Sequence, residues 1–243
     1  MKKKILFKAP VLTRSGYGEQ SRFALRALMD RQDLFDIYVQ PLQWGQTSWI
    51  NDNSIDRGWL DGTIEKTIAY IQQGGQFDIS FQVTIPNEWE QLAPVNIGYT
   101  AGIETNKVAH QWLTKGNEMD KIVVVSNHAK RVFEETAYMG VDQNTQQQVK
   151  LQLTTPVTTV NYPAKKFDDL PDLDIDFKND INFLVVAQFG PRKNLINTLK
   201  WFIEEFHDDE VGMILKTNLA KNCLLDRANV QNQLKEFVAN YPD

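Results

Sequence analysis

Cysteine and histidine are scarce in this chain of 243 residues, which contains one cysteine and three histidines. The single cysteine, Cys223, cannot form a disulfide within one chain. The histidines are scattered at positions 110, 128 and 207, without the spacing of zinc ligands. The sequence therefore argues against an internal disulfide framework and a structural zinc site, and it favours a reducing, cytoplasmic setting.

Long hydrophobic runs are also missing from the chain. No segment approaches the roughly 18 uncharged apolar residues of a membrane-spanning helix. Only Ile5, Leu6 and Phe7 follow the basic start of the chain before Lys8, far fewer than the ~7–15 apolar residues of a signal peptide. We therefore expect neither a transmembrane segment nor export.

An excess of positive charge is absent too, because 26 basic residues face 31 acidic ones and the net charge is -5. Binding of nucleic acid without sequence preference needs a basic surface field, so we expect no nucleic-acid partner. A small anionic ligand remains compatible with this balance, since a few local cations and backbone N–H groups can bind phosphate. The hydrophobic content of 42% and the charged content of 23% are typical of a globular protein.

Short apolar strands alternate with amphipathic helices through residues 1–163. The predicted strands cover residues 3–9, 36–40, 77–81, 95–99 and 121–125. Helices are predicted from residue 19 onward and over residues 62–73, 107–115 and 127–139, the last capped by Ser126 or Asn127. Residues 149–153 and 157–160 are predicted to form a hairpin or edge strands. This alternation indicates an α/β fold with a mostly parallel sheet covered on both faces, as in Rossmann-like domains.

A second α/β unit follows an aspartate-rich stretch over residues 164–180. Strands are predicted over residues 181–189 and 211–216, and helices over residues 195–206 and 226–240. This unit is shorter than the roughly 120–150 residues of a complete doubly wound domain. We therefore predict an N-terminal domain (1–163), an acidic linker (164–180) and an incomplete C-terminal domain (181–243), whose open sheet edge would favour a homodimer.

A glycine-containing turn lies between the first predicted strand and the first helix, and it consists of Ser15, Gly16, Tyr17 and Gly18. Glycines let a backbone approach a ligand, and the N-terminus of the following helix offers unpaired N–H groups. Open α/β sheets bind ligands at the carboxyl ends of their strands, where this turn is placed. The turn is therefore a candidate site for a phosphate or for the hydroxyl groups of an acceptor, with a plain tight turn as the alternative.

Neither NAD nor calcium fits the motifs of the chain. The third glycine of a dinucleotide fingerprint is replaced by Ser21, and Gln40 occupies the place of the acid that binds the ribose. Asp172, Asp174 and Asp176 are spaced as in a calcium loop, but the glycine and glutamate of that motif are missing. We expect no cofactor and no metal.

Two adjacent cations, Arg192 and Lys193, lie at the strand-to-helix turn of the second unit. Charge, hydrogen-bond donors and the helix dipole converge there, which suits a diphosphate. Lys216 and Thr217 end the next strand and would lie along the same sheet edge. The alternative is a solvated basic turn with Asn194 as the N-cap of the helix.

Other polar and aromatic residues follow strands of the first unit. Glu104 comes shortly after the strand over residues 95–99, so its carboxylate is a candidate catalytic group in the crevice of the glycine turn. The alternative is that Glu104 caps the helix predicted from residue 107. Trp44 and Trp49 lie in a polar loop and are candidates for stacking on a sugar.

Four segments together resemble the GT-B-fold glycosyltransferases of the group 1, or family 4, kind. They are Ser-Gly-Tyr-Gly-x-x-Ser-Arg at residues 15–22, residues 99–105 ending in Glu-Thr, residues 119–126 before a helix with Arg-Val-Phe at 131–133, and residues 189–194. The resemblance implies two Rossmann-like domains, with the acceptor bound by the first and a nucleotide-sugar by the second. It further implies no essential metal, retention of stereochemistry, Gly16 and Gly18 facing the cleft, and Lys193 in the place of the family's phosphate-binding lysine.

Two departures from this family pattern define the functional alternatives. Gln188 occupies the place of the family's phosphate-binding arginine, which leaves Arg192 as its substitute. The family's two glutamates spaced by eight positions have no counterpart, because no two glutamates of this chain have that spacing. The leading expectation is a hexosyltransferase that moves a sugar from a nucleotide-sugar to a hydroxyl of a carbohydrate, lipid or protein, with truncation of the chain as one explanation of the missing glutamates. The alternative is a non-catalytic module that binds carbohydrate or nucleotide.

Overall fold

The computed structural model describes residues 2–51, 55–141, 147–164, 166, 170, 172 and 174–241, with the backbone alone for residues 55 and 56. Two compact units make up the chain: Met1–Trp44 with Trp49–Ala164, and Gly45–Ser48 with Lys165–Asp243. Of the predicted acidic linker, residues 165, 167–169, 171 and 173 lie outside the described residues.

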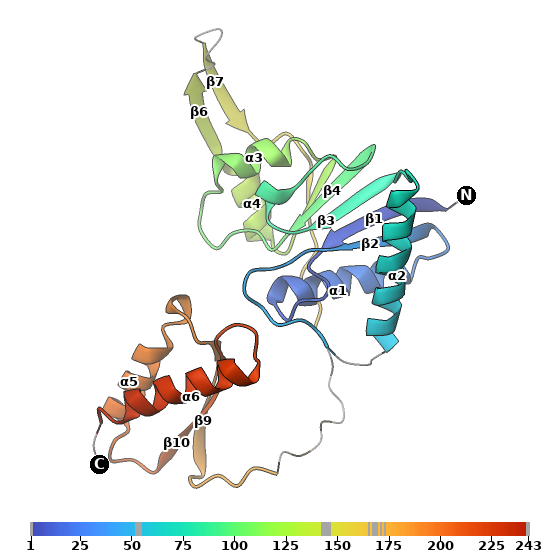
Figure 1. The fold of residues 1–243 in the computed structure, drawn as a ribbon. Helices are drawn as coiled ribbons and strands as arrows, with labels where there is room; N and C mark the ends of the chain where they lie inside the picture. The colour runs from blue at the N-terminus through green and yellow to red at the C-terminus, as the bar shows by residue number, and fades with distance from the viewer. Residues whose placement is uncertain are drawn as a thin grey trace. The chain divides into compact units, whose positions relative to one another are not determined.

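A parallel six-stranded sheet forms the centre of the first unit (Figure 1). Its strand order is β2-β1-β3-β4-β5-β8, and every neighbouring pair is parallel. The strands are β1 (Lys3–Ala9), β2 (Phe35–Pro41), β3 (Ile79–Val83), β4 (Val95–Thr100), β5 (Lys121–Val124) and β8 (Val157–Thr159). The sheet confirms the predicted α/β class with a mostly parallel, Rossmann-like arrangement. The chain reverses its direction across the sheet between β1 and β3, which is where doubly wound folds bind ligands.

Helices connect these strands in the predicted order, but α2 begins at Ile55, seven residues before the predicted start at residue 62. They are α1 (Gly16–Met29), α2 (Ile55–Gln72), α3 (His110–Gly116) and α4 (Asn127–Glu135), with a short 3-10 helix η1 (Pro86–Glu88). Helix α1 begins earlier than residue 19, because the Ser15 side chain accepts a hydrogen bond from the Gly18 N–H at 2.9 Å and caps the helix there. Ser126 caps α4, as one of the two predicted alternatives.

Helix α2 covers the open edge of β2, the first strand of the sheet. The Val39 N–H donates to the Thr67 hydroxyl at 2.8 Å, and Lys66 Nζ donates to the Ile37 carbonyl at 3.0 Å. These side chains occupy backbone groups that an unprotected edge strand would offer to another chain. This end of the sheet is therefore closed to strand addition by its own helix.

Two hydrophobic clusters form the core of the first unit. One joins Phe7 and Val39 of the sheet to Leu25 of α1 and includes Leu60 of α2. The other is built around Trp89, Leu113, Ile122 and Phe133, with further residues of the η1 loop, α3 and α4. The sheet is thus packed by helices and loops, as predicted for a parallel sheet.

The structure corrects the predictions for residues 127–160. Helix α4 ends at Glu135, and residues 137–139, which were predicted to be helical, belong to strand β6 (Ala137–Val141). Thr136 ends the helix because its backbone is extended and its buried hydroxyl accepts from the Val108 N–H at 3.2 Å. Strand β6 pairs antiparallel with β7 (Gln148–Gln152), so the predicted hairpin between residues 149–153 and 157–160 is wrong. The second of those segments is β8, an edge strand of the main sheet, as its alternative prediction had it.

The second unit contains two parallel strands, β9 (Ile181–Gln188) and β10 (Val211–Asn218). Its helices are α5 (Leu195–Glu205) and α6 (Leu224–Val238), with a 3-10 turn η2 (Pro191–Lys193) after β9. Phe183 of β9 packs against the rings of Phe202 and Phe206 at centroid distances of 5.7 and 5.2 Å. The order of predicted elements in this unit is confirmed, with shifts of one or two residues at most ends.

Candidate functional site

Gly16 and Gly18 lie in the first turn of α1, and neither has a positive φ. A Cβ atom on Gly18 would lie 2.1 Å from the carbonyl oxygen of Thr13, whereas a Cβ on Gly16 would have no neighbour within 4 Å. Gly18 is therefore required for close packing of α1 against the turn before it. A role of Ser15, Gly16 and Gly18 in ligand binding stays a prediction.

Tyr17 joins the first turn of α1 to the carboxyl end of β4. Its hydroxyl lies 2.8 Å from the Thr100 hydroxyl and accepts a hydrogen bond from the Ala101 N–H at 3.1 Å. Its ring packs against Trp44 at a centroid distance of 4.2 Å. Burial raises the pKa of Tyr17, and the nearby Glu88 carboxylate adds to the shift, so the phenol is neutral and can donate a hydrogen bond.

Sequence reasoning missed a group of polar residues between the ends of β1 and β3. Lys8 of β1 forms an ion pair with Glu90, and its side chain is only 9% exposed. The hydroxyl of Thr84, directly after β3, donates to the carboxylate of Glu88. These carboxylates are exposed at the point where the chain reverses across the sheet. The sequence feature that could have indicated this group is Lys8, a lysine within the otherwise apolar strand of residues 5–9.

Gln20 and Tyr99 form a buried polar pair beneath this edge, with exposed fractions of 6% and 3%. Gln20 Nε2 donates to the Tyr99 hydroxyl, while Gln20 Oε1 has no hydrogen-bond partner. Burial, with a contribution from Tyr162, raises the pKa of Tyr99 to about 12. The neutral phenol is therefore strongly favoured in the folded state.

The Tyr99 shift predicts a loss of stability at alkaline pH. A tyrosine with a pKa raised above its ordinary value of 10 in the folded state stabilises the fold fully below pH 10, and this contribution is lost as pH rises toward 12. Tyr99→Phe should therefore flatten the fall in the free energy of unfolding over this pH range, as measured by urea titrations. Tyr241→Phe in the second unit is the control. An unchanged slope in Tyr99→Phe would contradict the assignment.

Glu104 is exposed and follows β4 by four residues. It does not cap α3, because that helix begins after Ala109 without a side-chain cap. Burial raises the pKa of Tyr162, and the charges of Tyr17 and Glu104 add to this shift. The role of Glu104 as a catalytic group in the crevice of the glycine turn stays a prediction. Trp49, which was predicted together with Trp44 to stack on a sugar, is 51% exposed.

The predicted diphosphate residues of the second unit share one sheet edge. Arg192 and Lys193 belong to η2, shortly after β9, and Lys216 and Thr217 directly precede Asn218, the last residue of the neighbouring parallel strand β10. The Phe189 N–H donates to the Asn218 carbonyl at 2.8 Å, which ties the two strand ends together.

This edge is cationic and open. Arg192, Lys193 and Lys216 are exposed, and within the part of the chain that the structure describes no carboxylate pairs with them. The buried Thr217 hydroxyl has no hydrogen-bond partner. Asn194 adopts a left-handed backbone (φ 50°) at the start of α5, but its side chain does not cap the helix and instead accepts from Asn197. The N–H groups of the first turn of α5 are therefore not occupied by this side chain.

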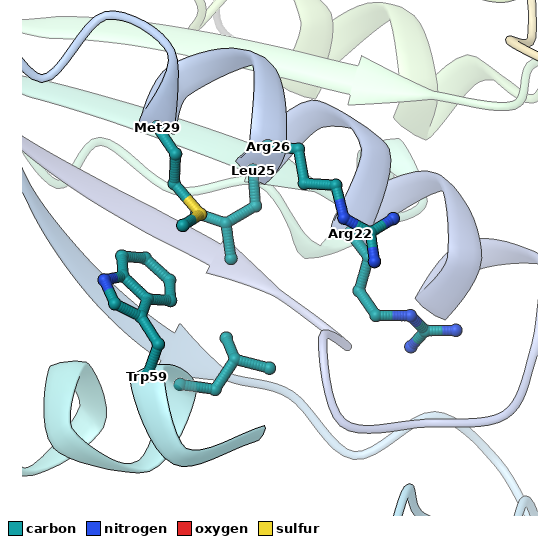
Figure 2. A pocket seen from close by; sticks show the side chains of 6 residues that line it. Arg22, Leu25, Arg26, Met29 and Trp59 are labelled. Atoms are coloured by element: carbon teal, nitrogen blue, oxygen red, sulfur yellow. The ribbon is translucent and has the colours of Figure 1, made fainter. Parts of the chain in front are cut away.

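A small apolar cavity separates α1 from α2 (Figure 2). Leu25, Met29 and Trp59 point toward one another around it, with Arg22 and Arg26 to one side. Its volume of about 20 Å³ holds roughly one water molecule, so it is a packing gap and not a ligand site.

Among the described residues, no set of three His, Cys, Asp or Glu side chains is placed to bind a metal. Within the same residues, no helix has the length and apolar character needed to cross a bilayer. Comparisons of the chain with protein-family models, with curated proteins and with solved structures found no match.

Proposed function

We propose that the protein binds a nucleotide-sugar and functions as a glycosyltransferase of the hexosyltransferase type, with a hydroxyl group as acceptor. The observation that carries this proposal is the cationic edge of the second unit. Arg192 and Lys193 directly precede α5, and Lys216 lies near the end of the neighbouring parallel strand β10, which supports this proposal. A diphosphate provides the negative charge and the acceptor oxygens that this edge lacks.

This edge suits the chemistry of sugar transfer. Negative charge develops on the diphosphate as the glycosidic bond to the donor breaks, and fixed cations stabilise that charge without a metal. Lys193 and Arg192 would bind the diphosphate oxygens, and Lys216 with Thr217 would complete the contact. The nucleotide-sugar is a substrate in this scheme, and no cofactor is required.

The acceptor is assigned to the carboxyl edge of the first unit. Hydroxyl, phenol and carboxylate groups gather there from Tyr17, Thr84 and Glu88, and the ring of Trp44 packs against Tyr17. Such groups suit a polyhydroxyl ligand, because carboxylates accept hydrogen bonds from hydroxyls and aromatic rings stack on sugar faces. Glu104 is the catalytic candidate, as an exposed carboxylate that can accept a hydrogen bond from the reacting hydroxyl.

Lys193→Ala is expected to weaken the binding of a nucleoside diphosphate about tenfold or more, since a charge-assisted hydrogen bond contributes roughly 1.5–3 kcal/mol. Isothermal titration calorimetry with uridine and guanosine diphosphates measures this directly. Lys200→Ala, on an exposed face of α5, is the matched control and should bind like the parent chain. Unchanged affinity in the Arg192→Ala/Lys193→Ala double variant would remove the donor-site assignment.

A second candidate function is a binding module without catalysis, favoured by the missing pair of glutamates spaced by eight positions. The two functions share the diphosphate site and differ in turnover. Transfer of a radiolabelled sugar from a nucleotide-sugar to a mixture of glycosides separates them. Binding without turnover would select the module.

A further inference from the structure

The β6–β7 hairpin projects from the first unit (Figure 1) and lies outside the residues assigned to sugar transfer. Isolated two-stranded hairpins are marginally stable in water. Met139, Val141 and Val149 of this hairpin are 65%, 58% and 50% exposed. Its ten strand residues carry one charge, that of Lys150. Depletion of charge together with exposed apolar side chains is typical of a surface that another chain covers.

The two faces of strand β7 differ in character, whereas β6 carries Met139 and Val141 on the same face as Lys150. Cross-strand pairing places Tyr138 opposite Leu151 and Gly140 opposite Val149 on one face. With His110 of α3 and with Met139 and Val141 of β6, these residues line a groove of about 450 Å³ that continues the core of the unit. Lys150 lies on the opposite face, because side chains alternate along a strand. Strand β7 therefore presents apolar residues to the groove and a cation to the other side.

The outer edge of β7 is free along most of its length. At its base, Asn117 Nδ2 donates to the Gln152 carbonyl at 2.9 Å. Beyond that contact, the only partner of β7 within the described part of the sheet is β6. Lys107 lies near the groove, with its ammonium 4.0 Å from the centroid of the Tyr138 ring, and neither Lys107 nor Lys150 pairs with a carboxylate of the described residues. A strand added to this edge meets Lys150 on one face, and Lys107 lies near the groove on the other.

The chain itself contains a segment whose side-chain pattern complements the apolar face and the cationic face of β7. Asp174, Ile175, Asp176 and Phe177 alternate acidic and apolar side chains, as in a strand with one acidic and one apolar face. All four are exposed, and none takes part in a hydrogen bond or ion pair with the described residues. Ile175 and Phe177 are 48% and 45% exposed. We call residues 174–177 the acidic segment.

We propose that the acidic segment of a second copy of this chain adds as a strand to the free edge of β7. Ile175 and Phe177 would enter the groove beside Val149 and Leu151. The alternation would then place Asp174 and Asp176 on the face of Lys150, as opposite charges that stabilise a cross-strand pair. When each of two copies places its acidic segment beside β7 of the other, the two copies form a closed two-fold dimer.

The positions of the hairpin and of the chain exit favour a second copy as the occupant. The hairpin returns to the sheet at the amino ends of β5 and β8, where the Thr155 hydroxyl donates to the Met119 carbonyl. The chain leaves the unit at the carboxyl ends of these strands, where the Val160 N–H donates to the Val124 carbonyl. The chain therefore leaves the first unit at the opposite edge of the sheet from the hairpin of its own copy.

Sedimentation velocity of the full chain over a concentration series tests the proposal. A reversible dimer is expected, and Lys150→Glu should lower its association constant about tenfold or more, because two favourable cross-strand charge pairs become repulsive. Asp174→Lys/Asp176→Lys should weaken it similarly, and combining these changes with Lys150→Glu should restore association. Lys235→Glu on α6 is the control for a change of net charge and should dimerise like the parent.

A synthetic peptide with the sequence of residues 172–179 tests whether the acidic segment itself is what binds to β7. It should dissociate the parent dimer and should bind the Lys150→Glu variant about tenfold more weakly, as measured by fluorescence anisotropy. A parent chain that stays monomeric at all concentrations would overturn the proposal, whether or not the peptide binds. A dimer that Lys150→Glu and Lys235→Glu leave equally strong would overturn it as well.

Discussion

Gly18→Ala is expected to destabilise the first unit severely. The new methyl group would lie 2.1 Å from the Thr13 carbonyl oxygen and 2.7 Å from its hydroxyl oxygen, and the nearer atom belongs to the backbone. Overpacking of this kind costs about 3 kcal/mol, which lowers the melting temperature of a domain of this size by about 6–12 °C. The higher helix propensity of alanine offsets about 1 kcal/mol at most. Differential scanning calorimetry of the chain measures the loss.

Gly16→Ala is the matched control, since it makes the same change two residues earlier in the same helix. A Cβ at Gly16 meets no atom within 4 Å, so the variant should melt within a few degrees of the parent or slightly above it. Equal melting temperatures for the two variants would contradict the packing role of Gly18. A Gly16→Ala variant that melts normally but loses acceptor binding would place a ligand against this helix turn.

The sequence predicted the order of the elements well, because alternating and helical periodicities are local properties. The strand over residues 3–9 was assigned with its correct ends, since Pro10 follows it directly. The end of α4 was missed, because the residues up to Met139 are compatible with a helix and the extended Thr136 is held by the distant Val108 N–H. Strand β6 likewise depends on its pairing with β7, which no local pattern within residues 127–139 reveals.

Of the candidate site, the sequence could predict only which residues lie at the carboxyl edge of a sheet. A turn after a parallel strand lies at the carboxyl edge of the sheet, which placed Tyr17, Glu104 and Lys193 at such edges. Glycine is needed at position 18 because the Thr13 carbonyl lies so close to it, and Lys8 forms its ion pair with Glu90, 82 positions away. Both contacts depend on how the folded chain packs in three dimensions, so they could not be predicted from residue type and spacing.

The other large effect is expected for Trp89, which lies between the two exposed glutamates of the first unit. Trp89 is fully buried, and its ring fills the space above Gly98 so closely that a Cβ there would lie 2.5 Å from it. Trp89→Ala should therefore lower the free energy of unfolding by about 3–5 kcal/mol. Urea denaturation followed by circular dichroism measures this loss, and Trp49→Ala, at a half-exposed position of the same unit, is the control with little effect.

Trp89→Phe distinguishes the contribution of the ring from that of the indole N–H. The Trp89 Nε1 atom is buried without a hydrogen-bond partner, which costs about 1–3 kcal/mol in the parent chain. Phenylalanine keeps an aromatic ring above Gly98 and removes this donor, so the relief offsets much of the lost volume. Trp89→Phe should consequently lose far less stability than Trp89→Ala. Equal losses in the two variants would show that the indole N–H finds a partner in solution and that the shape of the ring alone determines the packing.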